Sequence, residues 1–362
     1  MTEKKRIIKS RINKLLSNTE QGIFIFVSGQ PFSRANNIEQ HFNPDSNFFY
    51  FTGLTYPETV AIIKNVRSQK QYVIFGKEAT EKEKVWNGDK LTLSQIKEIT
   101  GADAVYPIEE FSSKLEDYLS GAENLYYSFG IDESIDHLVM EKRNKLIHQS
   151  FIPKIAPIKI YDLGKIVENI RIIKDKSEIS SIKKAVKITE KAYNEVFKMA
   201  NKGMWEYEIE AFMDYMYRKE NAHPSFPTIV ASGANGTVLH YIENSRKIED
   251  GDMILLDSGA QYENYCADVT RTWPVSGKFT QAQKEIYSAV LDAQKESISC
   301  IKPGVTIESF HLKATNVLVE RMISLKILAG ERNKIIEEKS YQKFYMHKTG
   351  HHLGLDVHDG GG

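Results

Sequence analysis

The sequence has little cysteine, no excess of one charge and no long apolar run. Its two cysteines, Cys266 and Cys300, stand far apart, so the CxxC spacing that is typical of zinc sites or redox pairs is missing. Lysine plus arginine and aspartate plus glutamate both total 48, which gives a formal net charge of +0. Because no strongly basic surface follows from this balance, we expect no nucleic acid and no anionic membrane as a partner.

The amino-terminal stretch also lacks the features of a secreted or membrane-bound protein. Residues 1–20 carry charges throughout, without the apolar core and the small-residue cleavage site of a secretory signal. No stretch approaches the roughly 20 apolar residues that a membrane-spanning helix needs. We therefore expect a cytoplasmic protein in a reducing compartment, acting on a neutral substrate or a protein partner.

The length predicts two domains, because 362 residues and 41.4 kDa exceed what one hydrophobic core usually organises. Short β-rich runs alternate with polar turns in the first half, which indicates an α/β domain. These runs are Ile23–Val27, Phe48–Phe51, Val60–Ile63 and Tyr72–Phe75. Pro153 and Pro157 then interrupt the pattern, since proline disfavours a continuing helix or strand. We expect one domain over residues 1–165 and another over residues 170–362.

Three amphipathic helices are predicted after this boundary. The first begins at Asp175, which has capping-box spacing to Glu178, and is expected to run until Gly203. Its predicted core stripe consists of Ile179, Ile182, Val186, Tyr193 and Val196. The second helix begins near Trp205 and is expected to bury Ile209, Phe212, Met213 and Met216. The third begins at Thr280, carries Ile286 and Val290, and ends near Pro303–Gly304.

Two aspartates lie on apolar runs that read as the strands of a hairpin, Asp257 on the first and Asp268 on the second. A turn centred between Tyr262 and Glu263 places them directly opposite each other, with Cβ atoms about 5 Å apart. Carboxylates this close repel each other unless a cation lies between them. Oxygen ligands suit manganese, iron, cobalt or magnesium, and two such ions can share a carboxylate. The alternative is that Arg271 or a backbone turn satisfies one of the aspartates.

Histidines gather at the end of the sequence, where four of the ten fall in the last sixteen residues. They are His347, His351, His352 and His358. Imidazole is a common metal ligand and the usual proton carrier near neutral pH. His347 and His351 have the spacing of a helical zinc pair, but Gly350 and the missing glutamate argue against that motif. His240 is a fifth candidate, although by itself it is typical of a turn.

Four strings in order resemble the aminopeptidase P family: HYIEN at 240–244, DGDMILLDSGA from 250, YCADVTRTWPVSGKFTQAQKEIY from 265, and HKTGHHLGLDVHD at 347–359. The amino half is similar to the family's N-terminal domain in SRANNIEQHFNPDSNFFYFTGLTYPETVAII, which begins at 33. The resemblance therefore covers nearly the whole chain. It implies a creatinase-like α/β N-terminal domain followed by an α+β pita-bread catalytic domain.

The resemblance also implies a function, that of a metal-dependent Xaa-Pro aminopeptidase which releases the residue before a proline at the second position of a peptide. Two divalent metal ions, with manganese expected, would hold a bridging water that attacks the peptide carbonyl. Matched position by position, Asp257 resembles a metal ligand, Asp268 the carboxylate that touches both metals, and His351 the nitrogen ligand. A homo-oligomer is implied as well.

Four more residues resemble the family's catalytic and substrate-side groups. His240, His347 and His358 resemble the family's histidines that surround the metal ligands and face the substrate, of which His347 and His358 would contact the substrate and stabilise the developing charge. Phe226 resembles a residue that lines the substrate pocket. Substrate binding is thus expected at Phe226 and at all three histidines.

The sequence departs from the family pattern at its end. The family's last two metal ligands are glutamates on later strands, and one of them serves as the proton shuttle, whereas this sequence stops at Gly362. We expect a pita-bread domain that lacks its final strands, with an unpaired sheet edge. One interpretation is an incomplete sequence of an active metallopeptidase; the other is a catalytically impaired protein that acts as a binding module or pseudoenzyme. A prolidase or a methionine aminopeptidase would share the ligands, but the N-terminal domain favours aminopeptidase P.

Overall fold

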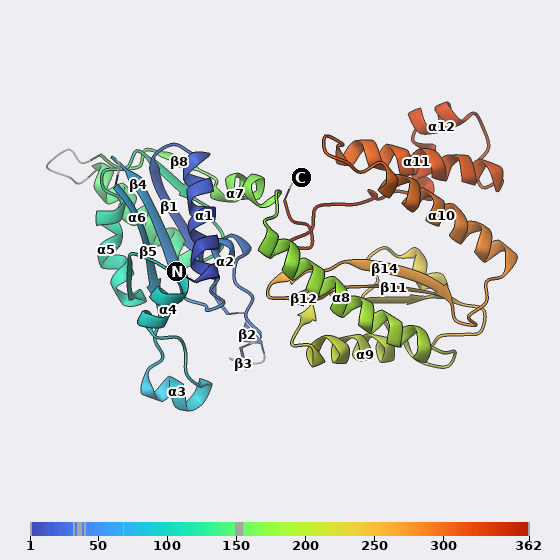
Figure 1. Cartoon of the computed structure of the whole chain (residues 1–362), viewed down its shortest axis with the longest axis horizontal. Coiled ribbons are helices and arrows are strands. Elements are labelled where there is room, and N and C mark those ends of the chain that lie inside the picture. The colour runs from blue at the N-terminus through green and yellow to red at the C-terminus, as the bar shows by residue number, and fades with distance from the viewer. Residues whose placement is uncertain are drawn as a thin grey trace. The chain divides into compact units, whose positions relative to one another are not determined.

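The computed structural model describes residues 2–31, 33–34, 38–39, 41–67, 69–148 and 155–360, with only the backbone described at 33–34 and 38–39. The chain divides into two compact units, Met1–Ile173 and Lys174–Gly362 (Figure 1). The boundary predicted between 165 and 170 falls inside the helix α7 (Leu163–Arg171), which belongs to the first unit. Pro153 lies outside the described residues. None of the described helices is long and apolar enough to cross a membrane.

The first unit is built on a six-stranded sheet with the strand order β6-β5-β4-β1-β7-β8. The strands are β1 (Gly22–Val27), β4 (Val60–Val66), β5 (Gln69–Gly76), β6 (Ala104–Pro107), β7 (Asn124–Tyr127) and β8 (Lys159–Tyr161). The central strand β1 pairs antiparallel with β4 and parallel with β7. The strands predicted at Ile23–Val27, Val60–Ile63 and Tyr72–Phe75 are confirmed.

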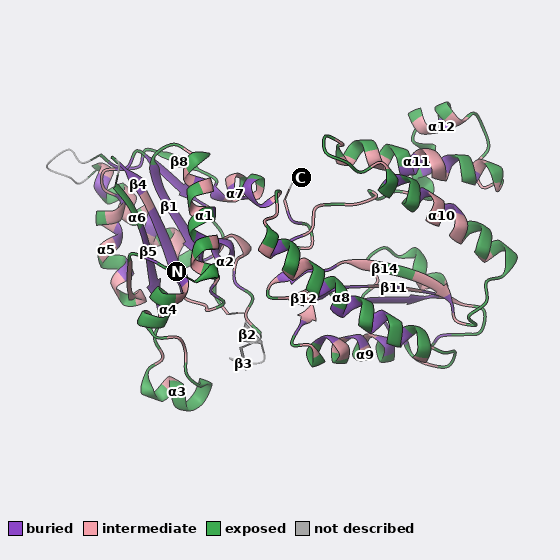
Figure 2. Ribbon diagram, viewed as in Figure 1, coloured by how far each residue is buried: buried purple, intermediate pink, exposed green. Residues whose placement is uncertain are grey.

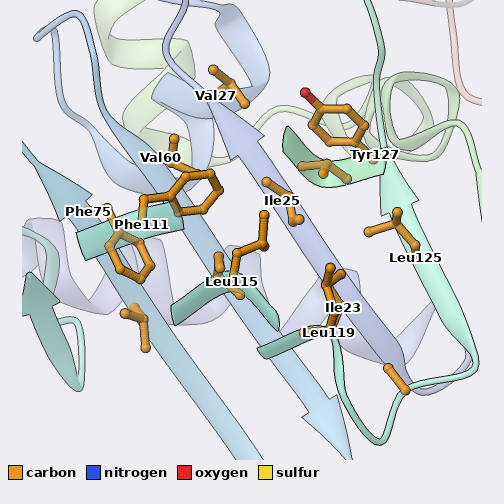
Figure 3. Packing of buried hydrophobic residues seen from close by; sticks show 14 of the residues in the cluster. Ile23, Ile25, Val27, Val60, Phe75, Phe111, Leu115, Leu119, Leu125 and Tyr127 are labelled. Atoms are coloured by element: carbon orange, nitrogen blue, oxygen red, sulfur yellow. The ribbon is translucent and has the colours of Figure 1, made fainter. Parts of the chain in front are cut away.

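Helices cover both faces of this sheet (Figure 1), which explains why β1 is buried at every position. Ile23 and Ile25 pack against Phe111 and Leu115 of α5 on one face (Figure 3), while Phe26 on the other face contacts the ring of Phe51. A strand that is buried on both faces is continuously apolar. The helices of this unit are α1 (Glu3–Ser17), α2 (Ser46–Thr52), α3 (Glu81–Asn87), α4 (Leu93–Thr100), α5 (Phe111–Leu119), α6 (Glu133–His148) and α7.

The strand predicted at Phe48–Phe51 is wrong, because these residues lie in the helix α2. The Asp45 side chain accepts a hydrogen bond from the backbone nitrogen of Phe48 at 2.8 Å, and Gly53 ends the helix in the left-handed region. These are the usual signals at the two ends of a helix. A short apolar run alone does not distinguish a buried strand from a buried helix.

The second unit packs two helices, α8 (Lys176–Met199) and α9 (Glu206–Lys219), against short antiparallel sheets (Figure 1). One sheet has the order β10-β11-β14 and another has the order β13-β12-β9. The strands are β9 (His223–Pro224), β10 (Ile229–Ser232), β11 (Met253–Ser258), β12 (Ala260–Tyr262), β13 (Tyr265–Cys266) and β14 (Val269–Pro274). The helices α10 (Gln281–Ser299), α11 (Ile307–Ser324) and α12 (Arg332–Glu337) follow.

The capping box of α8 is confirmed, since Asp175 and Glu178 each accept the other's backbone N–H. Its buried face differs from the predicted stripe: Ile179 and Val186 are 42% and 40% exposed. The buried positions are Glu178, Ala185, Ile188, Thr189, Ala192, Tyr193 and Val196, of which Tyr193 and Val196 were predicted. Small alanines let the helix approach the sheet closely, so the contact face includes positions that a hydrophobicity pattern undervalues. The helix also ends at Met199, before Gly203.

The predicted face of α9 is largely confirmed: Ile209 and Met213 are fully buried, while Phe212 and Met216 are partly buried. The predicted start of α10 is confirmed, since Thr280 is its N-cap, but the helix ends at Ser299 and its Ile286 and Val290 are 47% and 55% exposed. In Figure 2, α10 is mostly exposed, whereas β11 is largely buried.

Candidate metal centre

The hairpin that carries the two aspartates has a different register from the predicted one. Asp257 on β11 lies opposite Thr270 on β14, not opposite Asp268. The turn consists of Glu263 and Asn264, which both have a positive φ, 49° and 65°. Two left-handed residues are the requirement of the tight turns that match the twist of a hairpin. The prediction that the aspartates face each other directly is therefore wrong.

The correction leaves both aspartates on the same face of the hairpin. Moving the turn centre by one residue moves every pairing by two, and side chains alternate with a period of two. Asp268 is thus a diagonal neighbour of Asp257 across the ladder. Burial raises the pKa of Asp257, opposed by a hydrogen bond from Thr270, and the negative charge of Asp268 raises this pKa further.

A glycine allows the two strands to approach closely beside the aspartates. A Cβ atom at Gly259 would lie 1.7 Å from the carbonyl oxygen of Ala267, which no side chain tolerates. The Ser225 hydroxyl lies 2.8 Å from the Gly259 oxygen and 2.7 Å from the Ala267 oxygen. This crossing holds the strand ends that carry Asp257 and Asp268.

The final loop brings His351 to the aspartates. Its Nε2 lies 3.1 Å from Oδ2 of Asp268, and its Nδ1 lies 3.0 Å from the carbonyl oxygen of His352. The backbone carbonyl accepts a hydrogen bond from Nδ1–H and so leaves Nε2 to face the carboxylate. The ring of His358 packs edge-on against His351, with centroids 4.4 Å apart.

Two contacts hold this loop in place. The backbone nitrogen of Cys266 donates to the carbonyl oxygen of Gly354 at 2.8 Å. Lys174 Nζ lies 2.7 Å from Oδ2 of Asp359, and the two side chains are only 11% and 1% exposed. Burial raises the pKa of the Cys266 thiol to about 12, so this thiol stays protonated near neutral pH in the metal-free protein.

The remaining predicted residues lie farther from the aspartate pair or contact it less directly. His240 is exposed and close enough to Asp257 for a positive charge on its ring to favour the ionised carboxylate. His347 is exposed; its Nδ1 lies 2.9 Å from the carbonyl oxygen of Lys348. Phe226 is partly buried in the bend between β9 and β10.

The chemistry of these donors fits a divalent metal, although their arrangement is open. Oδ1 of Asp257 is buried without a hydrogen-bond partner among the described residues, which is costly unless an ion or water satisfies it. Carboxylate and imidazole are ligands that first-row divalent metals accept. In the described part of the chain, however, no three His, Cys, Asp or Glu side chains converge closely enough to hold an ion.

Sequence reasoning missed three charged residues that organise this region. Lys174 and Asp359 form the buried ion pair beside the histidine loop. Glu206 at the start of α9 is fully buried and binds the segment that precedes β11. Asp359 follows His358 in one of the recognised strings, so that string contained a signal, whereas nothing local distinguishes Lys174 or Glu206 from exposed helix residues.

Two family models match the chain. Residues 180–362 match the model described as metallopeptidase family M24, and residues 8–127 match the one described as aminopeptidase P, N-terminal domain. The first match spans the second compact unit almost completely, including the aspartate hairpin and the histidine loop.

Curated relatives and solved structures agree with these matches. The chain is 34% identical to the Xaa-Pro aminopeptidase of Escherichia coli strain K12, over 91% of this chain and 75% of that protein. It is 27% identical to human Xaa-Pro aminopeptidase 3, over 95% of this chain and 68% of that protein. A solved structure of zinc-substituted E. coli aminopeptidase P in complex with product superimposes with a TM-score of 0.95 and 31% identity, covering 99% of this chain and 82% of the other.

Proposed function

Because the chain belongs to metallopeptidase family M24 and carries an aminopeptidase P N-terminal domain, we propose that it is an Xaa-Pro aminopeptidase. Its fold is the α/β N-terminal domain followed by the pita-bread catalytic domain. The proposed reaction is hydrolysis of the peptide bond before a proline in the second position. The relatives that support this substrate are named Xaa-Pro aminopeptidases.

The observation that carries the proposal is the buried, unpartnered Oδ1 of Asp257 beside the Asp268–His351 contact. In this proposal Asp257, Asp268 and His351 hold two divalent ions, and the carboxylate-rich donor set favours manganese. When bound, such ions supply a water of lowered pKa and polarise the scissile carbonyl. A cation held by Asp257 and Asp268 would relieve the repulsion between the two carboxylates.

The protein side chains around these ligands have separate proposed tasks. His358, packed on His351, and His347 donate hydrogen bonds to the substrate and to the oxygen that gains charge in the transition state. His240, which lies near Asp257, also binds the substrate in this proposal. Phe226 provides apolar surface for the peptide. We also propose that the chain forms a homo-oligomer. Light scattering tests this by measuring the molar mass in solution.

The test is chelator-sensitive, manganese-dependent release of the N-terminal residue from a Xaa-Pro-Yaa peptide by the 362-residue chain. Asp268→Asn should release the metal, because it removes the carboxylate charge but keeps the side-chain volume. Asp250→Asn is the matched control, since this aspartate is 73% exposed beside Lys202. Unchanged metal content in Asp268→Asn refutes the ligand assignment. Peptide binding by folded, metal-loaded chain without release favours the binding module or pseudoenzyme.

A further inference from the structure

Glu206 is a buried carboxylate that the proposed chemistry does not use. It is the first residue of α9 and is 0% exposed. Oε1 accepts hydrogen bonds from the backbone nitrogen and the hydroxyl of Ser232, both at 2.7 Å. Oε2 accepts from the Tyr241 hydroxyl at 2.8 Å and from the backbone nitrogen of Arg246 at 2.9 Å. These donors belong to a single segment, residues 232–246.

This segment carries His240, directly before the anchored Tyr241. Glu206 binds it at its beginning, near its middle and at its end. The Tyr241 oxygen also accepts a hydrogen bond from the backbone nitrogen of Ser245 at 3.2 Å, so the turn after His240 closes on the same anchor. His240 itself is exposed and close to Asp257. The position of this histidine therefore depends on how firmly the segment is held.

Helix capping does not explain the burial of Glu206. The backbone nitrogen at the N-cap of α9, Trp205, donates to Glu208 at 2.6 Å, so Glu208 is the residue that caps the helix. Glu208 is exposed, as capping residues usually are. Burying a carboxylate is costly unless donors surround it, and the donors around Glu206 come from the His240 segment.

We propose that Glu206 is a positioning residue that fixes the His240 segment, and through it the substrate side of the site. The inference about catalysis rests on the proposed function of His240, whereas the inference about the segment does not. Glu206→Gln tests this role because it replaces one carboxylate oxygen by NH₂ and keeps the shape of the side chain. Both oxygens face donors, and a glutamine NH₂ placed against a backbone N–H leaves that N–H unsatisfied.

The first experiment measures amide hydrogen exchange in peptides that cover residues 232–246. Glu206→Gln should speed exchange in this segment, since the amide of either Ser232 or Arg246 loses its acceptor when one carboxylate oxygen becomes NH₂. Glu208→Gln is the matched control: it is the same substitution two residues along α9, and a glutamine can still cap the helix. Equal exchange in the two variants overturns the proposal, and this result does not depend on activity.

The second experiment measures kcat/KM for a Xaa-Pro-Yaa peptide in a double-mutant cycle with His240→Ala. Glu206→Gln should lower kcat/KM about 10- to 100-fold with unchanged metal content. In the His240→Ala background it should cost no more than about 2-fold, because the two residues act as one unit. Equal losses in both backgrounds show that Glu206 does not act through His240.

A milder variant keeps the proposal testable if Glu206→Gln does not fold. Tyr241→Phe removes one hydroxyl and leaves the other donors of the segment in place. It should show the same coupling to His240→Ala, with a smaller loss in the single variant. If the wild-type chain releases no residue from the peptide, the proposed function fails while the exchange experiment still decides the role of Glu206.

Discussion

The buried ion pair between Lys174 and Asp359 permits a quantitative prediction. Nζ and Oδ2 are 2.7 Å apart, and the side chains are 11% and 1% exposed. Lys174→Met keeps the apolar stem but removes the cation that lies 2.7 Å from a buried carboxylate. Breaking such a pair from one side costs about 3–5 kcal/mol, and we expect a loss of this size in the free energy of unfolding of the second unit.

The assay follows this unit alone. The chain has three tryptophans, of which Trp205 and Trp273 lie in the second unit and Trp86 in the first. Urea unfolding monitored by tryptophan fluorescence in a Trp86→Phe background therefore reports on the unit that contains the ion pair. The urea midpoint and slope give the change in the free energy of unfolding.

The matched control is Lys198→Met in the last turn of α8, the helix that begins just after Lys174. Lys198 lies 2.6 Å from Glu195, an equally short pair, but these side chains are 69% and 47% exposed. Exposed pairs typically contribute about 0.2–1 kcal/mol. If Lys174→Met and Lys198→Met change the free energy of unfolding by similar amounts, burial is not what makes the Lys174–Asp359 pair important, and the reasoning is refuted.

Three further predictions concern the site. His358→Ala should slow turnover more than it lowers metal content, since His358 packs on His351 and is not a proposed ligand; parallel losses contradict this. Because burial raises the pKa of Asp257, the folded metal-free chain binds its proton more tightly than the unfolded chain, and this contribution to stability is lost as pH rises through the folded pKa. Asp257→Asn should therefore stabilise metal-free protein increasingly from acid to neutral pH in thermal melts, and a pH-independent difference contradicts the assignment. Gly259→Ala should cost at least about 3 kcal/mol because its Cβ meets Ala267, whereas Gly236→Ala, with its nearest atom at 3.9 Å, should melt like the wild type.

The comparison of prediction and structure shows which local signals are reliable. Buried strands such as β1 were predicted because a short, continuous apolar run with β-branched residues is typical of a strand that is buried on both faces. The same kind of run at Phe48–Phe51 is a helix, since Asp45 and Gly53 bound it and the apolar pattern alone is ambiguous at this length. The capping box at Asp175 and the helix start at Thr280 were predicted correctly, because such signals involve only residues close together in the sequence.

Helix faces were predicted less well than helix starts. Ile179, Val186, Ile286 and Val290 were expected in the core, and all four are at least 40% exposed. The buried face of α10 consists of Ala289, Ala293 and Ser297, and that of α8 includes Ala185 and Ala192, because the partner element decides which side of a helix packs against it. Which face of a helix is buried therefore depends on the packing of the whole unit and cannot be predicted from the sequence of that helix alone.

The sequence by itself determined the family, the fold class, and the shared face of Asp257 and Asp268. Side-chain alternation has a period of two, and even a register error of two residues preserves it. Only the tertiary structure decided the register, through left-handed backbone at Glu263 and Asn264, and the contact of His351 with Asp268. The anchoring roles of Glu206 and Lys174 were also decided there, because their partners lie far away in the chain and become neighbours only when it folds.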